Sequence, residues 1–178
     1  MCRISFNELT FQEYSGGKIP EYFRYDSEDD CLVEFYNEDA ESLHNQSITK
    51  IVNVLYNGRM VGYCAFATSE IKYLHLEKDD KYSTLPHPSL KLGRLLVCKK
   101  KKKKGIGFHI ITYFVEKALA LNKEIPIRFL LVDALPNAVS FYVEKCGFVN
   151  TRILKGKDRD LALLYIDINK FMRKYDNS

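Results

Sequence analysis

The chain has 178 residues, of which 46% are hydrophobic and 28% charged, and its formal net charge is +4, a profile ordinary for a soluble globular protein. Its five cysteines are scattered without a C-x-x-C pair, which argues against a disulfide framework or a metal site and favours a reducing compartment. No secretory signal or apolar membrane span is evident, so we expect one domain over residues 1–178, in the cytoplasm and without contact to a membrane.

The first part of the chain predicts strands and one helix. Ile4–Leu9 suits a short strand, and the apolar spacing over Leu32–His44 predicts an amphipathic helix. Ile51–Tyr56 and Met60–Thr68 are β-rich runs, and the pair Asn57-Gly58 between them predicts a tight hairpin turn.

The middle of the chain predicts a strand, a glycine-marked turn and a helix. Ile71–Leu76 is a candidate continuation of the preceding strand, and the polar, proline-containing segment Lys78–Pro88 is expected to be a loop. Leu90–Cys98 has the composition of a buried strand, and Phe108–Leu121 predicts a strongly apolar helix.

The last part repeats this alternation. Ile127–Ala134 predicts a strand, and a helix is expected from Pro136 to Cys146, ended by Gly147. Phe148–Leu154 and Leu161–Ile168 predict two further strands, and the tail Asn169–Asp176 a helical turn or two. The order of elements predicts a mixed α+β or α/β domain around one sheet.

The most informative segment joins the strand that ends at Cys98 to the helix that begins at Phe108. It holds six consecutive lysines, Lys99–Lys104, followed by Gly105-Ile106-Gly107. Unpaired N–H groups at a helix N-terminus, glycines that allow close approach and adjacent lysines together suit a phosphate. The spacing matches neither the P-loop nor the dinucleotide motif. A solvated lysine run beside a turn without a ligand is the alternative.

A second segment strengthens the first. Leu131-Val132-Asp133-Ala134 closes a strand, Asn137-Ala138 opens a helix that carries Phe141-Tyr142, and Gly147-Phe148 ends it. In this order, the two segments resemble the GNAT superfamily of N-acetyltransferases. In that superfamily a Q/R-x-x-G-x-G/A loop is followed by a helix, a strand and a second helix, which begins with Asn, carries an aromatic residue followed by Tyr and ends with Gly-Phe. The resemblance covers residues 90–149 best.

The resemblance implies an acetyl-CoA-dependent N-acetyltransferase whose central, mostly antiparallel, twisted sheet has about six to seven strands flanked by helices. Backbone N–H groups of the loop would hold the pyrophosphate, and the end of the strand would lie along the pantetheine arm. Lys102 departs from the usual Gln or Arg, keeping the charge but losing the planar fork of arginine. The implied cofactor-binding residues are Leu96, Val97, Cys98, Lys102, Lys103, Lys104, Gly105, Ile106, Gly107 and Asn137.

The resemblance also implies that Tyr142 protonates the leaving thiolate, since a phenol with a pKa of about 10 can donate to it efficiently. A buried aromatic that only packs the helix on the sheet is the alternative. No general base is evident: His44, His75 and His87 are isolated and are expected at the surface, while His109 could meet a phosphate. An α-amine, with a pKa of about 7.7–8.0, needs little help from a base.

A further resemblance concerns the acceptor. It is to the GNAT toxins of toxin–antitoxin pairs, which acetylate the α-amine of aminoacyl-tRNA, and it rests on Asp30-Cys31-Leu32, Phe35, Ala40, Val61-Gly62-Tyr63 and Leu92-Gly93-Arg94-Leu95. It implies tRNA phosphates on the lysine-rich edge and a weak substrate-binding role for Arg94. Another amine, on a small metabolite or a protein, stays open, as does a non-catalytic CoA- or RNA-binding module. An antitoxin partner and a homodimer are left open as well.

Overall fold

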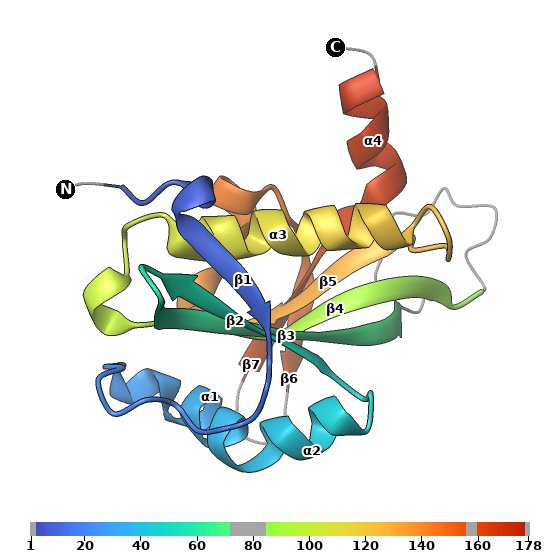
Figure 1. The fold of residues 1–178 in the computed structure, drawn as a ribbon. Helices are drawn as coiled ribbons and strands as arrows, with labels where there is room; N and C mark the ends of the chain where they lie inside the picture. Colours follow the sequence, from blue (N-terminus) through green and yellow to red (C-terminus); the bar gives the residue numbers. More distant parts are fainter. Residues whose placement is uncertain (1–2, 72–84, 156–159, 177–178) are drawn as a thin grey trace. The chain divides into compact units, whose positions relative to one another are not determined.

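The computed structural model describes residues 3–71, 85–155 and 160–176. Its strands are β1 (Leu9–Glu13), β2 (Lys50–Tyr56), β3 (Arg59–Ile71), β4 (His87–Val97), β5 (Phe129–Ala134), β6 (Val149–Lys155) and β7 (Asp160–Asp167) (Figure 1). Its α-helices are α1 (Asp30–Glu34), α2 (Ala40–Asn45), α3 (Ile106–Leu121) and α4 (Ile168–Asp176). Shorter 3-10 and π-helical turns are η1 (Phe6–Glu8), η2 (Ser27–Asp29), η3 (Phe35–Asp39), η5 (Lys99–Lys101), η6 (Pro136–Ala138) and η7 (Phe141–Lys145).

Within the described residues the strands form one seven-stranded sheet, in the order β1-β2-β3-β4-β5-β7-β6. β4 pairs with β5 in parallel, whereas β1 with β2, β2 with β3, β5 with β7 and β6 with β7 pair antiparallel. The predicted fold class, a mostly antiparallel α+β sheet flanked by helices, is confirmed.

Two compact units divide the chain. The first comprises Met1–Ala67 and Gly93–Tyr113, and the second comprises Thr68–Leu92 and Phe114–Ser178. The boundaries fall within β3, β4 and α3, and each unit is described below by itself. The extent of one domain over residues 1–178 stays a prediction.

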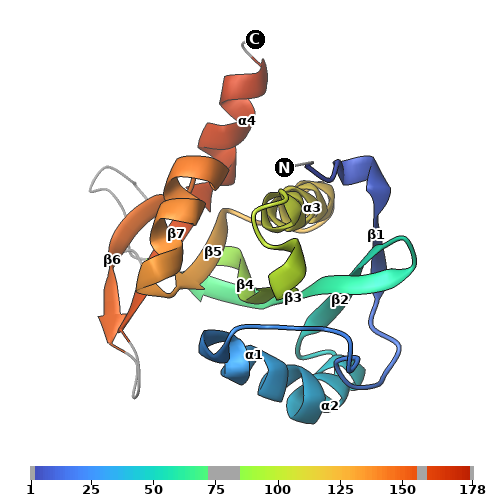
Figure 2. The same ribbon diagram turned by 90° about the vertical axis from the view of Figure 1, so that its left-hand side faces the viewer.

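The first unit is built on the hairpin of β2 and β3. Asn57 and Gly58 have φ angles of 51° and 71°, so both central residues of the turn are left-handed, as the tight turn of a twisted hairpin requires. The predicted Asn-Gly turn is therefore confirmed. Figure 2 shows α1 and α2 on one side of β2 and the N-terminal turns of α3 on the other, so the strands of this unit are covered on both faces.

Aromatic side chains form the centre of the first unit. Tyr63 is fully buried, its ring centroid lies 4.8 Å from that of Tyr36, and Tyr36 lies 5.3 Å from Tyr14. The Tyr63 hydroxyl donates to the Leu32 carbonyl at 2.7 Å. A buried phenol needs such a partner, and this one joins β3 to α1.

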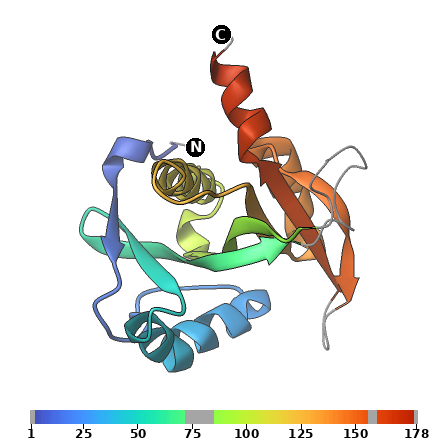
Figure 3. The ribbon, with the colours of Figure 1, turned by 90° about the vertical axis from the view of Figure 1, so that its right-hand side faces the viewer.

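The second unit contains the parallel strand pair. Ser89–Leu92 of β4 pairs with Phe129–Val132 of β5, and β5 pairs along its length with β7. Arg128 N–H donates to the Pro88 carbonyl at 2.8 Å, and the Arg128 guanidinium meets the Asp167 carboxylate at 2.9 Å. The first contact joins the start of β5 to β4, and the second joins it to the end of β7, from which α4 continues (Figure 3).

Most predicted elements are confirmed, including the tail helix and the strands at Leu90–Cys98 and Ile127–Ala134. The predicted helix Leu32–His44 is present as α1, η3 and α2 in succession, with a π-helical stretch in the middle. Helix α3 begins at Ile106, slightly before its predicted start, because the glycine turn ends there. The helix after Pro136 also carries a π-helical stretch, η7.

One predicted strand is wrong. Ile4–Leu9 is not extended: the Ser5 backbone and hydroxyl both donate to the Glu8 carboxylate at 2.8 Å, which closes the turn η1 and delays β1 to Leu9. The predicted loop Lys78–Pro88 is too long, since β4 already begins at His87. Its part at 78–84, and the strand continuation at 72–76, lie outside the described residues.

Candidate active site

A reversing loop connects the end of β4 to the start of α3. After Val97 the chain forms η5, in which Lys101 N–H donates to the Cys98 carbonyl at 2.8 Å. Lys103 and Gly105 then take positive φ angles of 62° and 94°. Backbone that alternates in handedness turns its N–H groups toward one side, a geometry that suits an anion.

Helix α3 begins directly after this loop and is 16 residues long. His109 N–H donates to the Gly105 carbonyl at 3.1 Å, while the N–H groups of Ile106, Gly107 and Phe108 belong to the first turn and have no acceptor within the helix. Ile106 is buried and anchors the helix start. The positive end of the helix dipole and an amide at a glycine together favour a phosphate here.

Lys102 is held by two carboxylates of the first unit. Its Nζ lies 2.7 Å from Asp26 Oδ2 and 2.8 Å from Asp29 Oδ2, and Lys99 Nζ lies 2.8 Å from Asp26 Oδ1. The hydrogen bonds from Lys102 and Lys99 lower the pKa of Asp26 to about 2. Burial disfavours the charge of Lys102, but the two carboxylates outweigh burial and raise its pKa. The ammonium of Lys102 is thus already paired with carboxylates of its own chain.

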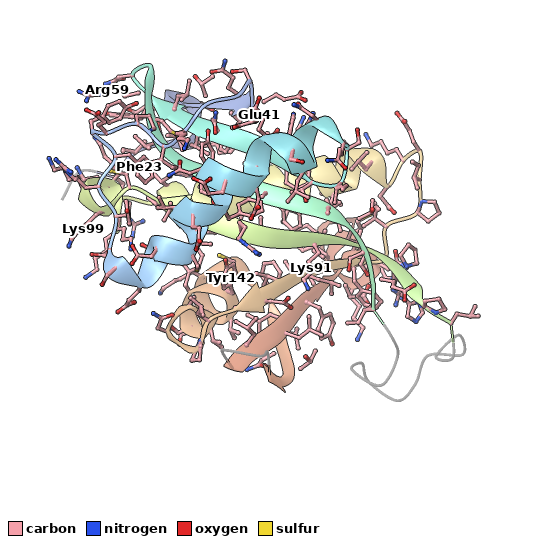
Figure 4. The ribbon with its side chains drawn as sticks, turned by 90° about the horizontal axis from the view of Figure 1, so that it is seen from below. Phe23, Glu41, Arg59, Lys91, Lys99 and Tyr142 are labelled. Carbon is pink, nitrogen blue, oxygen red and sulfur yellow. The ribbon has the colours of Figure 1, made fainter. Side chains whose placement is uncertain are left out.

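The same region is joined through the backbone. Lys99 N–H donates to the Arg24 carbonyl at 2.6 Å, and Figure 4 shows the neighbouring Phe23 at the same end of the first unit as Lys99. Sequence reasoning did not identify Asp26 or Asp29 as partners of the loop. The sequence feature that could have indicated this pairing is the acidic stretch before α1, since its charge is opposite to that of the lysine run.

Other side chains of the loop contact the first unit as well. Lys101 Nζ lies 4.6 Å from the centre of the Tyr56 ring, a cation–π contact. Ile4 N–H donates to the Lys104 carbonyl at 3.0 Å, and His109 Nε2 lies 2.8 Å from the Ile4 carbonyl. The His109 ring therefore contacts the N-terminal segment through Nε2. Only its other ring nitrogen, Nδ1, is left for the expected contact with a phosphate.

The end of β4, expected along the pantetheine arm, is buried. Leu96, Val97 and Cys98 are all buried, and Cys98 N–H donates to the Val61 carbonyl at 2.8 Å. A Cβ placed on Gly62 would lie 2.6 Å from the Leu96 carbonyl oxygen. The glycine in β3 is therefore required by the close approach of the β4 backbone.

Arg94, expected to bind substrate weakly, is exposed on β4 in the first unit. Its guanidinium carbon lies 4.9 Å from the centre of the Phe35 ring, and Nη1 donates to the Gly93 carbonyl at 2.8 Å. Stacking on Phe35 fixes the guanidinium over η3 without removing its charge.

The expected surface location is wrong for two histidines. His44 Nδ1 accepts a hydrogen bond from Ile51 N–H at 3.2 Å, and its side chain is 12% exposed. His87 is 8% exposed, and its ring packs edge-on against Phe129 with centroids 5.5 Å apart. The hydrogen bond to His44 and the ring contact of His87 both arise from tertiary packing. The sequence around an isolated histidine does not reveal such contacts. His75 lies outside the described residues.

Tyr142 and Asn137 belong to the second unit. Tyr142, in the π-helical turn η7, is 7% exposed, and its ring meets those of Phe141 and Phe148 edge-on, with centroids 5.1 Å and 5.6 Å apart. Its carbonyl accepts a hydrogen bond from Phe148 N–H at 3.1 Å. The two aromatic neighbours fix the plane of the Tyr142 ring. Asn137 is exposed in η6.

A charged pair that the sequence did not predict lies on β4 and β5 of the second unit. Lys91 Nζ is 2.5 Å from Asp133 Oδ2, and the two side chains are 33% and 23% exposed. Asp133 Oδ1 is buried and, among the described residues, has no hydrogen-bond partner. Figure 4 labels Lys91 and Tyr142, which both belong to the second unit.

The residues that the structure describes lack two further features. They contain no group of three or more His, Cys, Asp or Glu side chains arranged to hold a metal ion. They also contain no helix with the length and apolar character needed to cross a bilayer.

The comparison with protein families identifies the class. The model of the acetyltransferase (GNAT) family matches residues 8–148, so the chain belongs to the GNAT acetyltransferase family. It is therefore an acetyltransferase, and acetyl-CoA is the donor that this fold uses, as the sequence predicted.

Individual relatives are toxins. The tRNA-acetylating toxin of Mycobacterium tuberculosis (strain ATCC 25618 / H37Rv) is 26% identical over 121 residues, which cover 67% of this chain and 73% of that protein. A crystal structure of a bacterial toxin has a TM-score of 0.80 at 17% identity, with 96% of each chain covered. AtaT complexed with acetyl-methionyl-tRNAfMet has a TM-score of 0.75 at 18% identity, covering 94% of this chain and 99% of AtaT. AtaTR bound with acetyl-CoA has a TM-score of 0.70 at 19% identity, covering 95% and 99%.

Proposed function

We propose that this protein transfers the acetyl group of acetyl-CoA to the α-amine of aminoacyl-tRNA. The observation that carries the proposal is the strand–loop–helix segment from β4 to α3, in which Lys103 and Gly105 reverse the backbone just before the first-turn amides of the helix. Such amides bind a phosphate without needing a particular side chain.

In the first unit, the N–H groups of the loop Lys102–Gly107 bind the pyrophosphate of acetyl-CoA. The main chain at Leu96, Val97 and Cys98 lies along the pantetheine arm. Lys102 acts mainly through its backbone, because its ammonium is already paired with Asp26 and Asp29. The exposed lysines Lys100 and Lys103 remain to attract anionic groups.

In the second unit, Asn137 hydrogen-bonds the donor and Tyr142 acts as the acid. The neutral amine attacks the thioester carbonyl, a C–N bond forms, and the C–S bond breaks. The departing sulfur takes the phenolic proton of Tyr142, the nitrogen releases one proton to water, and the phenolate is reprotonated from water. Burial of the Tyr142 ring between two phenylalanines holds the phenol in a defined position.

Three observations favour aminoacyl-tRNA as the acceptor. An α-amine, with a pKa of about 7.7–8.0, has an appreciable neutral fraction at physiological pH and demands no strong base. The exposed part of the lysine run and Arg94 offer positive charge to phosphates. The curated relative is named a tRNA-acetylating toxin. The proposal places the protein in the cytoplasm with an antitoxin as partner, while the homodimer stays a prediction.

The test is acetyl transfer from radiolabelled acetyl-CoA to a panel of in vitro charged tRNAs. We expect label in acid-precipitable RNA for one or more aminoacyl-tRNAs and none for uncharged tRNA. Transfer should weaken steeply between 50 and 200 mM salt if phosphates are bound, by at least about tenfold.

Free amino acids, polyamines and a peptide with a free N-terminus serve as competing acceptors in the same assay. Label on one of these, and none on charged tRNA, would assign a different acceptor to the enzyme. Binding of acetyl-CoA without transfer to any amine would instead favour a non-catalytic binding module.

A further inference from the structure

The parallel pair in the second unit ends before its strands do. Its register runs from Ser89 with Phe129 to Leu92 with Val132, while β5 continues to Ala134. In sheets with parallel strands, ligands bind beyond the carboxyl ends of such pairs, where the strands no longer hydrogen-bond to each other. Asp133 is the first residue of β5 beyond the last of these pairs.

Asp133 lies on a sheet face where its nearest neighbours in β5 and β7 are Leu131, Leu163 and Tyr165. Its partner in the β5–β7 register is Leu163, and Leu131, two residues before it, belongs to the same face. Leu131 and Leu163 are buried members of one apolar cluster. Neither leucine side chain can donate a hydrogen bond to a carboxylate, and burial of an unsatisfied polar atom is costly.

The two oxygens of Asp133 are used differently. Lys91, which stands opposite Leu131 in the β4–β5 register, binds Oδ2 at 2.5 Å. Oδ1 is buried and has no hydrogen-bond partner among the described residues. A buried acceptor atom without a partner is stabilised by a donor that reaches it. Lys91 therefore fixes the side chain and leaves one carboxylate oxygen for an N–H or O–H group.

We propose that Asp133 Oδ1 accepts a hydrogen bond from the amine that is acetylated, and that Lys91 is a positioning residue for that contact. This inference rests on the proposed function and names the group that recognises the acceptor's nitrogen. One N–H of the amine points to Oδ1, so that the nitrogen lone pair is oriented for attack. The contact strengthens as the nitrogen gains positive charge in the transition state.

Lys91 has a second effect. A lone carboxylate would hold the amine in its protonated, unreactive form. Lys91 offsets that charge, so the pair can bind the amine while it is neutral. Of the described residues on this face near Asp133, Lys91 from β4 is charged, Leu163 from β7 is apolar and Tyr165 from β7 carries a phenol.

The experiment measures acetyl transfer by wild-type protein, Asp133→Asn, Asp133→Ala and Lys91→Met with saturating acetyl-CoA and a charged tRNA. We expect Asp133→Asn and Asp133→Ala to lower kcat/KM for the acceptor by at least about tenfold, with the Kd for acetyl-CoA within about twofold of wild type. Glu144→Gln, which removes an exposed carboxylate on η7, is the control and should match wild type.

The pH profile separates this role from a structural one. Lys91→Met should move the rising limb of kcat to higher pH, by about one unit, because the uncompensated carboxylate favours the ammonium form of the bound amine. Asp133→Ala should lack that shift, and a loss of packing alone would shift neither profile. Unfolding temperatures identify any variant that fails to fold. If Asp133→Ala does not fold, the kcat/KM and pH profiles of Asp133→Asn and Lys91→Met test the inference.

Each failure points to a different conclusion. If wild-type protein transfers acetyl to no amine, the proposed function fails. If it transfers acetyl and both Asp133 variants keep the wild-type kcat/KM and pH profile, the inference is overturned while the function stands, and water alone occupies Oδ1. A wild-type profile for Lys91→Met would overturn the part assigned to Lys91.

Discussion

The ammonium of Lys102 lies 2.7 Å from the carboxylate of Asp26, across 76 residues of sequence. The pair ties the proposed pyrophosphate loop to the segment that leads into α1. An unpaired cationic side chain at this position could bind the phosphates of acetyl-CoA. In this chain the ammonium of Lys102 is instead paired with Asp26 and Asp29. The loop is therefore expected to depend on its backbone amides and on the rigidity that Asp26 and Asp29 confer.

Asp26 should contribute stability in a defined pH range. Its hydrogen bonds from Lys102 and Lys99 lower its pKa from 3.8 to about 2, so the folded protein binds this proton less readily than the unfolded chain does. The contribution is present above the ordinary pKa and is lost as pH falls through about 2. Urea unfolding of wild type and Asp26→Asn should show a clear gap at pH 7 that shrinks toward pH 2. Asp39→Asn, at an exposed carboxylate, should show no such pH-dependent gap.

Gly62→Ala should destabilise the first unit. The added Cβ would lie 2.6 Å from the Leu96 carbonyl oxygen, a backbone atom that cannot move away by rotating a side chain. We expect a loss of about 1–3 kcal/mol in the free energy of unfolding and weaker acetyl-CoA binding, because Leu96 lies on the strand proposed for the pantetheine arm. Chemical denaturation and titration calorimetry measure both. Gly93→Ala, whose Cβ would meet Ala65 O at 3.8 Å, is the matched control, and equal losses in both variants would contradict the explanation.

For the binding of acetyl-CoA, we expect Lys103 to act through its backbone conformation more than through its charge. Its φ of 62° is left-handed, a conformation that costs a non-glycine residue about 1–2 kcal/mol. Lys103→Gly should keep acetyl-CoA binding and should unfold at a higher free energy, because glycine does not pay the cost of the left-handed conformation. Lys103→Val should lose both stability and acetyl-CoA binding. Thermal unfolding and acetyl-CoA titration distinguish them. Tighter binding by the valine variant would show that the loop does not need this conformation.

Tyr142→Phe should reduce kcat by about 10²-fold or more, because the proton donor for the leaving sulfur is lost. The Kd for acetyl-CoA should stay close to the wild-type value, since the ring contacts with Phe141 and Phe148 need no hydroxyl. Steady-state transfer and calorimetry test the two halves of this expectation. Tyr25→Phe removes the hydroxyl of an exposed tyrosine and should leave kcat unchanged. Full activity in Tyr142→Phe would exclude the phenol as the acid.

Local patterns in the sequence correctly predicted the elements whose causes are local. The Asn57-Gly58 turn was identified because positive φ is a property of those two residue types. The start of β1 was placed too early because the Ser5–Glu8 hydrogen bonds compete with extended structure over a few residues. Burial of His44 and His87 was missed because their contacts come from Ile51 and Phe129, which the histidines' own neighbours in sequence do not reveal.

Local features of the chain suffice to predict the class of fold, the family resemblance and the backbone character of the loop before α3, since hydrophobic period, glycine position and motif spacing act over short stretches of chain. Which charges meet depends on the folded chain. Lys102 with Asp29, 73 residues apart, and Lys91 with Asp133 come together only when the strands have paired. An ion pair depends on distance in space, and the path of the folded chain sets that distance.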